Sequence, residues 1–295
     1  MKLHVINSGN FKLDGGAMFG VVPKTLWSKT NSADENNYCN WSTRCLLIED
    51  GNRLILIDNG MGDKQDAKYF SHFYLNGNDA LHKSLKTAGF SADDVTDMVL
   101  SHLHFDHCGG SIQYNKNKTG YETTFKNATY WSHTDHWEWA TKPNAREKAS
   151  FLKENIIPIQ ESGQLNWITG TTDLTQGGNE YINNNLLGEN ISILISRGHT
   201  DAMMIPHIKY KGKTIVFMAD LLPSVGHIPL PYIASYDTRP LITLTEKEKF
   251  LNLAANEGFV LFLEHDSVNE CCTVQQTERG VRLKETFKLK EYFGG

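Results

Sequence analysis

Short apolar runs recur along the chain, and a polar or turn-forming residue follows most of them. These runs are rich in Val, Ile and Leu, which is typical of strands buried in a sheet that is covered on one face. The predicted strands are Leu46–Glu49, Leu54–Asp58, Met98–Ser101, Thr129–Ser132, Ile191–Ser196, Thr214–Ala219 and Phe259–Glu264. The pattern therefore predicts a protein that contains extensive sheet.

Stretches with helical spacing lie between the predicted strands. They are Asp79–Ala88, which stops at Gly89, then Lys142–Asn155, and Thr245–Glu257 with Thr245 as its N-cap. Short strands mixed with outer helices predict an α/β layered sandwich and not a doubly wound parallel fold. The absence of a GxGxxG or Walker-type loop gives no support to a nucleotide cofactor.

A single domain over residues 1–295 is the simplest organisation, because no repeat and no low-complexity linker interrupts the chain. Residues 120–167 are aromatic and charged, and we expect them to form a helical insertion in that domain. The stretch Gly170–Gly188 is rich in Gly, Thr and Asn, which predicts turns.

The composition and charge of the chain favour a globular protein and give no support to a nucleic-acid-binding one. Of the 295 residues, 40% are hydrophobic and 21% are charged, which is ordinary for a globular protein with a sizeable core. The net charge of −5 offers no basic surface, so a nucleic-acid partner is not expected. No apolar run approaches the roughly 18 residues of a membrane span. The five cysteines show no CxxC spacing and the N-terminus has no signal-peptide pattern, so we expect a cytoplasmic protein.

The segment His102-Leu103-His104-Phe105-Asp106-His107 places three imidazoles and a carboxylate within six positions. An apolar run precedes it and Gly109-Gly110 follows, so the ligand-type side chains are expected at the end of a strand. Imidazole and carboxylate are ligands that zinc and similar ions prefer, and core packing requires no such density of them. The segment predicts a metal site.

Further side chains of ligand type follow later strands. His199 follows the run Ile191–Ser196 after the short link Arg197-Gly198. Asp220 directly follows Thr214–Ala219, and His265 directly follows Phe259–Glu264. Four ligands from one loop are too many for one open ion and too few for two, so these three are candidates to complete a two-metal site.

The whole set, HxHxDH followed by Gly-His, a strand-terminal Asp and a strand-terminal His, resembles the metallo-β-lactamase superfamily. The resemblance implies a four-layer αββα sandwich. It assigns His102, His104 and His199 to one ion, and Asp106, His107 and His265 to the other, with Asp220 bridging both. It also implies that Asp58, at the end of Leu54–Asp58, supports the ligands through hydrogen bonds.

A narrower resemblance, to bacterial quorum-quenching lactonases, covers nearly the full chain. It rests on the segments Leu13–Lys24, Leu26–Lys29, Met218–Pro223 and Ala234–Asp237. These enzymes open N-acyl-homoserine lactones or related γ-butyrolactones. The resemblance implies two divalent ions, zinc first with Fe, Mn or Co as alternatives, that share a hydroxide. Asp106 and Asp220 are then the catalytic carboxylates, with Asp106 relaying a proton to the leaving oxygen.

The chain departs from that family in two places. After His199 it reads Thr200-Asp201-Ala202, without the usual second Gly-His pair, and it has Pro223 where some lactonases place a tyrosine. A phenol that assists the leaving group would then come from Tyr232 or Tyr236. Substrate-pocket candidates are Met18, Phe19, His227 and Tyr236.

Several alternatives stay open at this point. The same site could act on phosphotriesters, or on thioesters as glyoxalase II-like enzymes do. A non-catalytic metal-binding module and a flavodiiron-type redox module are more remote. The apolar N-terminal loop would serve the interface of a homodimer as well as a pocket rim. His133 and His136 imitate a ligand pair, but we expect them at an exposed helix start, and we expect Cys108 to be a buried packing residue.

Overall fold

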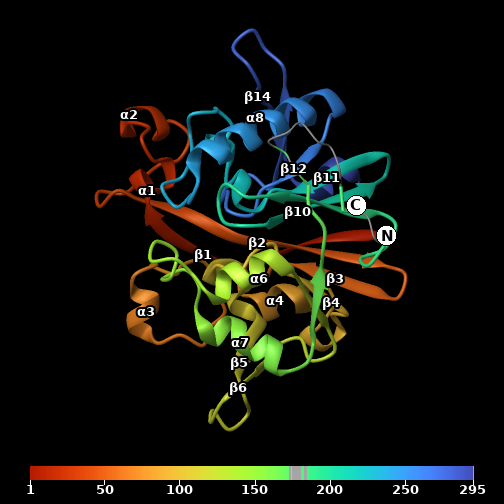
Figure 1. Cartoon of the computed structure of the whole chain (residues 1–295). Helices are drawn as coiled ribbons and strands as arrows, with labels where there is room; N and C mark the ends of the chain where they lie inside the picture. The colour runs from red at the N-terminus through yellow and green to blue at the C-terminus, as the bar shows by residue number, and fades with distance from the viewer. Residues whose placement is uncertain (173, 175–180, 183–184, 295) are drawn as a thin grey trace. The chain divides into compact units, whose positions relative to one another are not determined.

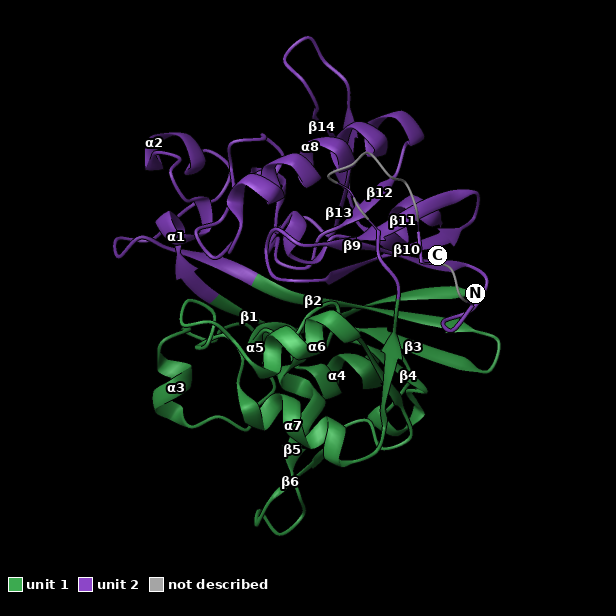
Figure 2. Cartoon of the chain, in the orientation of Figure 1, with its two compact units in different colours: residues 1–11, 42–169 green, residues 12–41, 170–295 purple. Residues whose placement is uncertain are grey.

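The chain folds into two units whose segments alternate along the sequence, as the computed structural model shows (Figure 2). Unit 1 comprises residues 1–11 and 42–169, and unit 2 comprises residues 12–41 and 170–295. The structure describes residues 1–172, 174, 181–182 and 185–294, so much of the predicted turn segment Gly170–Gly188 lies outside the described residues. Strands β1 (Lys2–Asp14) and β2 (Tyr38–Asp50) each contribute residues to both units.

The sheet of unit 1 has the strand order β1-β2-β3-β4-β7-β8. Its further strands are β3 (Arg53–Ile57), β4 (Asp97–Val99), β7 (Thr129–His133) and β8 (Leu165–Ile168). Strands β3, β4, β7 and β8 pair in parallel, whereas β2 pairs with β3 in antiparallel fashion. A separate hairpin joins β5 (Ile112–Tyr114) and β6 (Tyr121–Thr123). The parallel strands β3 and β4 therefore present their carboxyl ends at one edge, where polar side chains can leave the core.

Helices cover one face of this sheet (Figure 1). The helical elements of unit 1 are α3 (Ala67–Ser71), α4 (Leu81–Thr87), η1 (Ala92–Asp94), α5 (Phe105–Cys108), η2 (Gly109–Ser111), α6 (Thr134–Thr141) and α7 (Lys153–Glu161). Leu85 of α4, Trp137 of α6 and Ile159 of α7 belong to one buried cluster with strand residues such as Met98 and Tyr130. Burial of this apolar surface stabilises the unit and fixes the strand ends.

The sheet of unit 2 has the order β14-β13-β12-β11-β10-β9. The strands are β9 (Ile191–Ser196), β10 (Met203–Tyr210), β11 (Lys213–Phe217), β12 (Val260–Phe262), β13 (Cys271–Gln275) and β14 (Arg282–Phe287). Strands β11 and β12 are parallel, and the other pairs are antiparallel. The helical elements are α1 (Gly15–Phe19), α2 (Lys24–Trp27), η4 (Ala219–Leu221), η5 (Val225–His227), α8 (Pro240–Glu257) and α9 (Leu289–Phe293). In the part of the chain that the structure describes, no helix combines the length and apolarity needed to cross a membrane.

Every predicted strand overlaps an observed one, which confirms the α/β class. The predicted helix Asp79–Ala88 corresponds to α4. The stretch 120–167, expected as a helical insertion, also supplies β7 and β8 to the sheet. The strands that were not among the predicted runs are β1, β5, β6, β8, β10, β13 and β14.

Two helix predictions were wrong in their bounds. The predicted helix Lys142–Asn155 begins only at Lys153, because the Asn144 side chain accepts the backbone N–H groups of Arg146 and Glu147 and so stabilises a turn. Helix α8 begins at Pro240 and not after Thr245, because proline is well suited to the first helical position. Thr245 lies inside the helix, where its hydroxyl donates to the Leu241 carbonyl.

Candidate metal centre

In unit 1 the ligand-type residues follow the carboxyl end of β4. Asp58 follows the parallel neighbour β3 and has a left-handed backbone, with φ of 57°. Its carboxylate accepts the backbone N–H of Ser101 at 2.7 Å and also the Ser101 hydroxyl. These contacts fix the start of the loop that carries His102 and His104.

The imidazoles of His102 and His104 face each other. His102 Nε2 lies 3.1 Å from His104 Nδ1, and both side chains are buried. Two nitrogens that bind one tetrahedral zinc at 2.0–2.1 Å lie about 3.3 Å apart. The pair therefore fits two ligands of one ion, and the remaining nitrogen of His102 lies 3.1 Å from the Ser101 hydroxyl.

His107 is oriented by Asp58. Its Nδ1 lies 3.0 Å from Asp58 Oδ2, and its Nε2 lies 3.9 Å from Asp106 Oδ1. A histidine ligand commonly donates its second N–H to a carboxylate, which fixes the tautomer and the ring orientation. The contact fits the predicted supporting role of Asp58, although that role toward a metal stays a prediction.

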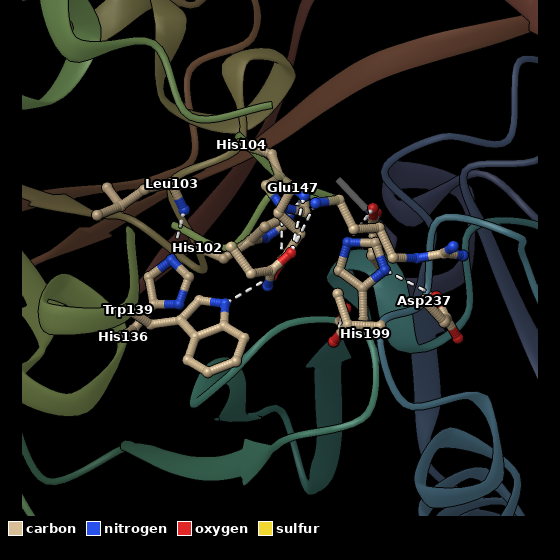
Figure 3. Close-up of polar contacts among 12 residues, drawn as sticks. His102, Leu103, His104, His136, Trp139, Glu147, His199 and Asp237 are labelled. Carbon is tan, nitrogen blue, oxygen red and sulfur yellow. Dashed lines mark hydrogen bonds and ion pairs between the residues drawn. The ribbon is translucent and has the colours of Figure 1, made fainter. Parts of the chain in front are cut away.

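Glu147 supports His104 from a position that the sequence analysis missed. Its carboxylate lies 3.4 Å from His104 Nε2 and accepts the Trp139 indole N–H at 2.7 Å and the Asn144 amide at 2.8 Å (Figure 3). The side chain is buried, so these donors stabilise its negative charge. Nothing in the local sequence around Glu147 indicates this role, because the partner His104 lies 43 positions earlier.

In unit 2 the loop after β9 is held by Glu246 of α8. This buried carboxylate accepts the Ser196 hydroxyl at 2.7 Å and the backbone N–H groups of Arg197 and Gly198 at 2.7 and 3.0 Å. Burial raises the pKa of Glu246, and the three donors oppose that rise. A side chain at Gly198 would overlap the backbone of Thr243, so only glycine allows this close approach.

The carboxylate of Asp220 lies against two imidazoles. His199 Nε2 is 3.0 Å from Asp220 Oδ2, and His265 Nε2 is 3.0 Å from Asp220 Oδ1. Asp220 lies in η4 beyond β11, and His265 lies beyond the parallel strand β12, so both follow the same sheet edge. Each oxygen of this carboxylate thus contacts a different histidine.

The second nitrogen of His199 is also engaged. Its Nδ1 lies 2.8 Å from Asp237 Oδ1 (Figure 3). Burial lowers the pKa of His199, but the Asp220 and Asp237 carboxylates outweigh that effect and raise it to about 10. The raised pKa favours the protonated ring at neutral pH, and a metal ion that bound Nε2 would have to displace that proton.

The predicted pocket residues of unit 2 lie in two environments. Phe19 stacks on His227 with ring centroids 4.4 Å apart, and both are buried. His227 Nε2 lies 2.9 Å from the Met18 carbonyl, and its Nδ1 lies 2.9 Å from the Ser224 hydroxyl. Burial lowers the pKa of His227 to about 3, so this ring is neutral. Tyr236 is 40% exposed. Their role in substrate binding stays a prediction.

Lys247 of α8 anchors the segment that follows His227. Its buried ammonium group donates to the carbonyls of His227, Pro229 and Tyr232 at 3.0, 3.1 and 2.8 Å. An ammonium group has three N–H donors, and each can meet one of these carbonyl oxygens. This contact ties the segment 227–232 to the long helix.

The expectation of an exposed helix start at His133 and His136 was half wrong. Helix α6 does begin there, with His133 as its N-cap accepting the Asp135 N–H at 3.1 Å. Both histidines are buried, however, since His133 ends the interior strand β7 and His136 lies near the His102 and Phe151 rings. Cys108 is a buried residue as predicted, and burial raises the pKa of its thiol to about 12.

Comparisons with known proteins agree with this architecture. An N-acyl homoserine lactonase of Bacillus thuringiensis is 30% identical over 121 residues, which cover 37% of this chain and 44% of that protein. A probable metal-dependent hydrolase from Staphylococcus aureus has a solved structure with a TM-score of 0.82 and 27% identity, covering 97% of this chain and 98% of its own. The solved structure of a dizinc quorum-quenching lactonase in complex with a product has a TM-score of 0.74 and 24% identity. The match covers 98% of this chain and 97% of that chain.

The family model of the metallo-beta-lactamase superfamily matches residues 40–265, which is more than half of the chain and includes every predicted ligand. The S. aureus structure covers nearly the full chain, so the similarity in fold extends beyond the matched residues. The chain therefore belongs to the metallo-beta-lactamase superfamily and has its fold.

Proposed function

We propose that this protein is a dinuclear metal-dependent hydrolase that opens a lactone or a related carboxylic ester. The observation that supports it most strongly is the position of the Asp220 carboxylate, with one oxygen 3.0 Å from His199 Nε2 and the other 3.0 Å from His265 Nε2. A carboxylate that presents its two oxygens to two different histidines suits a bridge between two ions.

The proposed ligand sets follow the superfamily motif. His102, His104 and His199 would hold one ion, and Asp106, His107 and His265 would hold the other, with Asp220 shared. The 3.1 Å separation of His102 Nε2 and His104 Nδ1 supports the first set. All these donors are imidazole or carboxylate, which suits zinc and also iron, manganese and cobalt. Zinc is our first choice because a structural neighbour is a dizinc enzyme.

When bound, the ions lower the pKa of water and polarise an ester carbonyl. The protein's own residues would orient the ligands. Asp58, Glu147 and Asp237 each contact one ring nitrogen of a histidine, which would leave the other nitrogen for a metal ion. Asp106 would belong to the second ligand set and would also carry a proton to the leaving oxygen.

A lactone is the proposed substrate class because the relatives in the sequence and structure comparisons include N-acyl homoserine lactonases. A small-molecule ester is consistent with the net charge of −5, which offers no basic surface for a polyanion. Tyr236 is the pocket candidate with the most exposed side chain, and a homodimer remains an additional prediction.

The test is a hydrolysis panel with the metal-reconstituted protein. N-acyl-homoserine lactones of several acyl lengths should be opened, and paraoxon and lactoylglutathione should be poor substrates. Asp220→Ala and His199→Ala should lose bound metal and lactonase activity together. Lactone opening that persisted in chelated protein, or a clear preference for paraoxon or lactoylglutathione, would contradict the proposal.

A further inference from the structure

We propose that His136 is a positioning residue that sets the spacing of two metal ligands by holding the backbone between them. The inference rests on the proposed function only in taking His102 and His104 as ligands of one ion. It gives a role to one of the two histidines that imitate a ligand pair in the sequence.

The contact lies at the centre of the ligand loop. The backbone N–H of Leu103 donates to His136 Nε2 at 2.8 Å, and Figure 3 shows the His136 ring directed at that nitrogen. Leu103 is completely buried and His136 is 1% exposed, so water cannot replace the ring as acceptor. A buried backbone N–H without a partner destabilises a fold, and the ring supplies that partner here.

The fold explains why this side chain reaches the loop. Strands β4 and β7 pair in parallel, and the pairing continues past β4 because Leu100 N–H donates to the Trp131 carbonyl at 3.0 Å. Both strands therefore end at the same edge. Helix α6 starts directly after β7, so its first turn places His136 beside the loop that follows β4.

The hydrogen bond from Leu103 to His136 can affect both His102 and His104, because Leu103 lies between them. The backbone angles of Leu103 therefore contribute to the 3.1 Å distance between His102 Nε2 and His104 Nδ1. The His136 ring also lies near the His102 ring and the Phe151 ring, with centroids 6.2 and 5.9 Å away. These neighbouring rings help to hold the His136 acceptor at the Leu103 N–H.

The chemistry of the contact defines the test variants. Nε2 can accept a hydrogen bond only through its lone pair, so the ring carries its proton on Nδ1. A glutamine amide oxygen can also accept this N–H. Leucine cannot, and the methionine thioether is a weak acceptor that fills irregular space well. His136→Gln should therefore preserve the spacing, whereas His136→Leu and His136→Met should relax it.

Zinc affinity of the full chain, measured by competition with a chromophoric chelator, is the main readout. Partners that orient metal ligands typically contribute 10–100-fold to metal affinity. We expect His136→Leu and His136→Met to lose about 10-fold or more, and His136→Gln to stay within about threefold of wild type. If His136→Leu does not fold, the zinc affinity of His136→Met tests the same expectation.

The matched control is His207→Leu, since His207 is also buried, in β10 of unit 2, and contacts the Ile205 carbonyl. It should lower the melting temperature without changing zinc affinity. Wild-type zinc affinity in folded His136→Leu or His136→Met would overturn the inference, as would an equal loss in His136→Gln. Because no substrate is used, a protein that binds zinc in this pattern but opens no lactone would contradict only the proposed function.

Discussion

His199 Nδ1 lies 2.8 Å from Asp237 Oδ1, while its Nε2 lies 3.0 Å from Asp220. One imidazole thus contacts two carboxylates through its two nitrogens. In the proposed site Nε2 would bind the metal, and Asp237 would orient the ring by accepting the Nδ1–H.

Replacing Asp237 should weaken metal binding without removing a ligand. We expect Asp237→Ala to lower zinc affinity about 10–100-fold, because the ring loses its orienting partner. Asp237→Asn should lie between that variant and wild type, since the amide oxygen still accepts the Nδ1–H. Chelator competition measures the effect, and equal zinc affinity in all three proteins would show that Asp237 does not orient His199.

Gly198→Ala should displace the loop that carries His199. The added Cβ would overlap the backbone nitrogen and the hydroxyl of Thr243, which helix α8 holds in place. We expect a loss of about 2 kcal/mol in the free energy of unfolding and at least a 10-fold loss in zinc affinity. Gly120→Ala is the control, because its Cβ would meet the Asn115 amide at an ordinary 3.5 Å. A wild-type melting temperature and zinc affinity in Gly198→Ala would contradict the steric argument.

Lys247→Met should destabilise the protein although it leaves every proposed ligand intact. Three buried carbonyls, those of His227, Pro229 and Tyr232, would lose their donor. We expect a loss of about 3 kcal/mol in the free energy of unfolding, measured by urea denaturation. Lys249→Met on the same helix is the matched control, since Lys249 is partly exposed, and it should change stability by less than about 1 kcal/mol. Equal effects in the two variants would argue against a structural role for the buried ammonium group.

The metal-free protein should show a pH dependence that arises from His199. Burial lowers the pKa of this residue, but Asp220 and Asp237 raise it from 6.5 to about 10. Folding therefore favours the charged ring, so its contribution to stability is fully present below pH 6.5 and is lost as the pH rises toward 10. We expect the difference in urea midpoint between wild type and His199→Gln, both metal-free, to shrink over this range. A difference that grows with pH would contradict the assignment.

The strands and the candidate ligands could be predicted because one rule connects them. A His or Asp at or just beyond the end of a buried run marks the point where a side chain leaves the core. His102, His199 and His265 all lie at such points. The Ser101 and Asp58 contact could be anticipated for a related reason, since Asp58 ends the neighbouring apolar run.

The residues that orient the ligands were harder to predict. Glu147 contacts His104 across 43 positions, and Glu246 contacts Ser196 across 50. Before folding, each is a charged residue in a polar stretch, and a buried carboxylate cannot be distinguished from an exposed one by local pattern. His136 was placed on the correct element but assigned the wrong exposure, because the burial of α6 depends on tertiary packing.

Strands β1 and β2 have a consequence for how the protein can be divided. Because each contributes residues to both units, residues 12–41 belong to unit 2 while the segments on either side belong to unit 1. Trimming the chain from either terminus therefore cannot yield one intact unit, and isolating unit 1 would require joining residue 11 to residue 42. During synthesis, part of unit 2 leaves the ribosome before unit 1 is complete at residue 169. The two units therefore cannot be inherited, expressed or exchanged as consecutive modules.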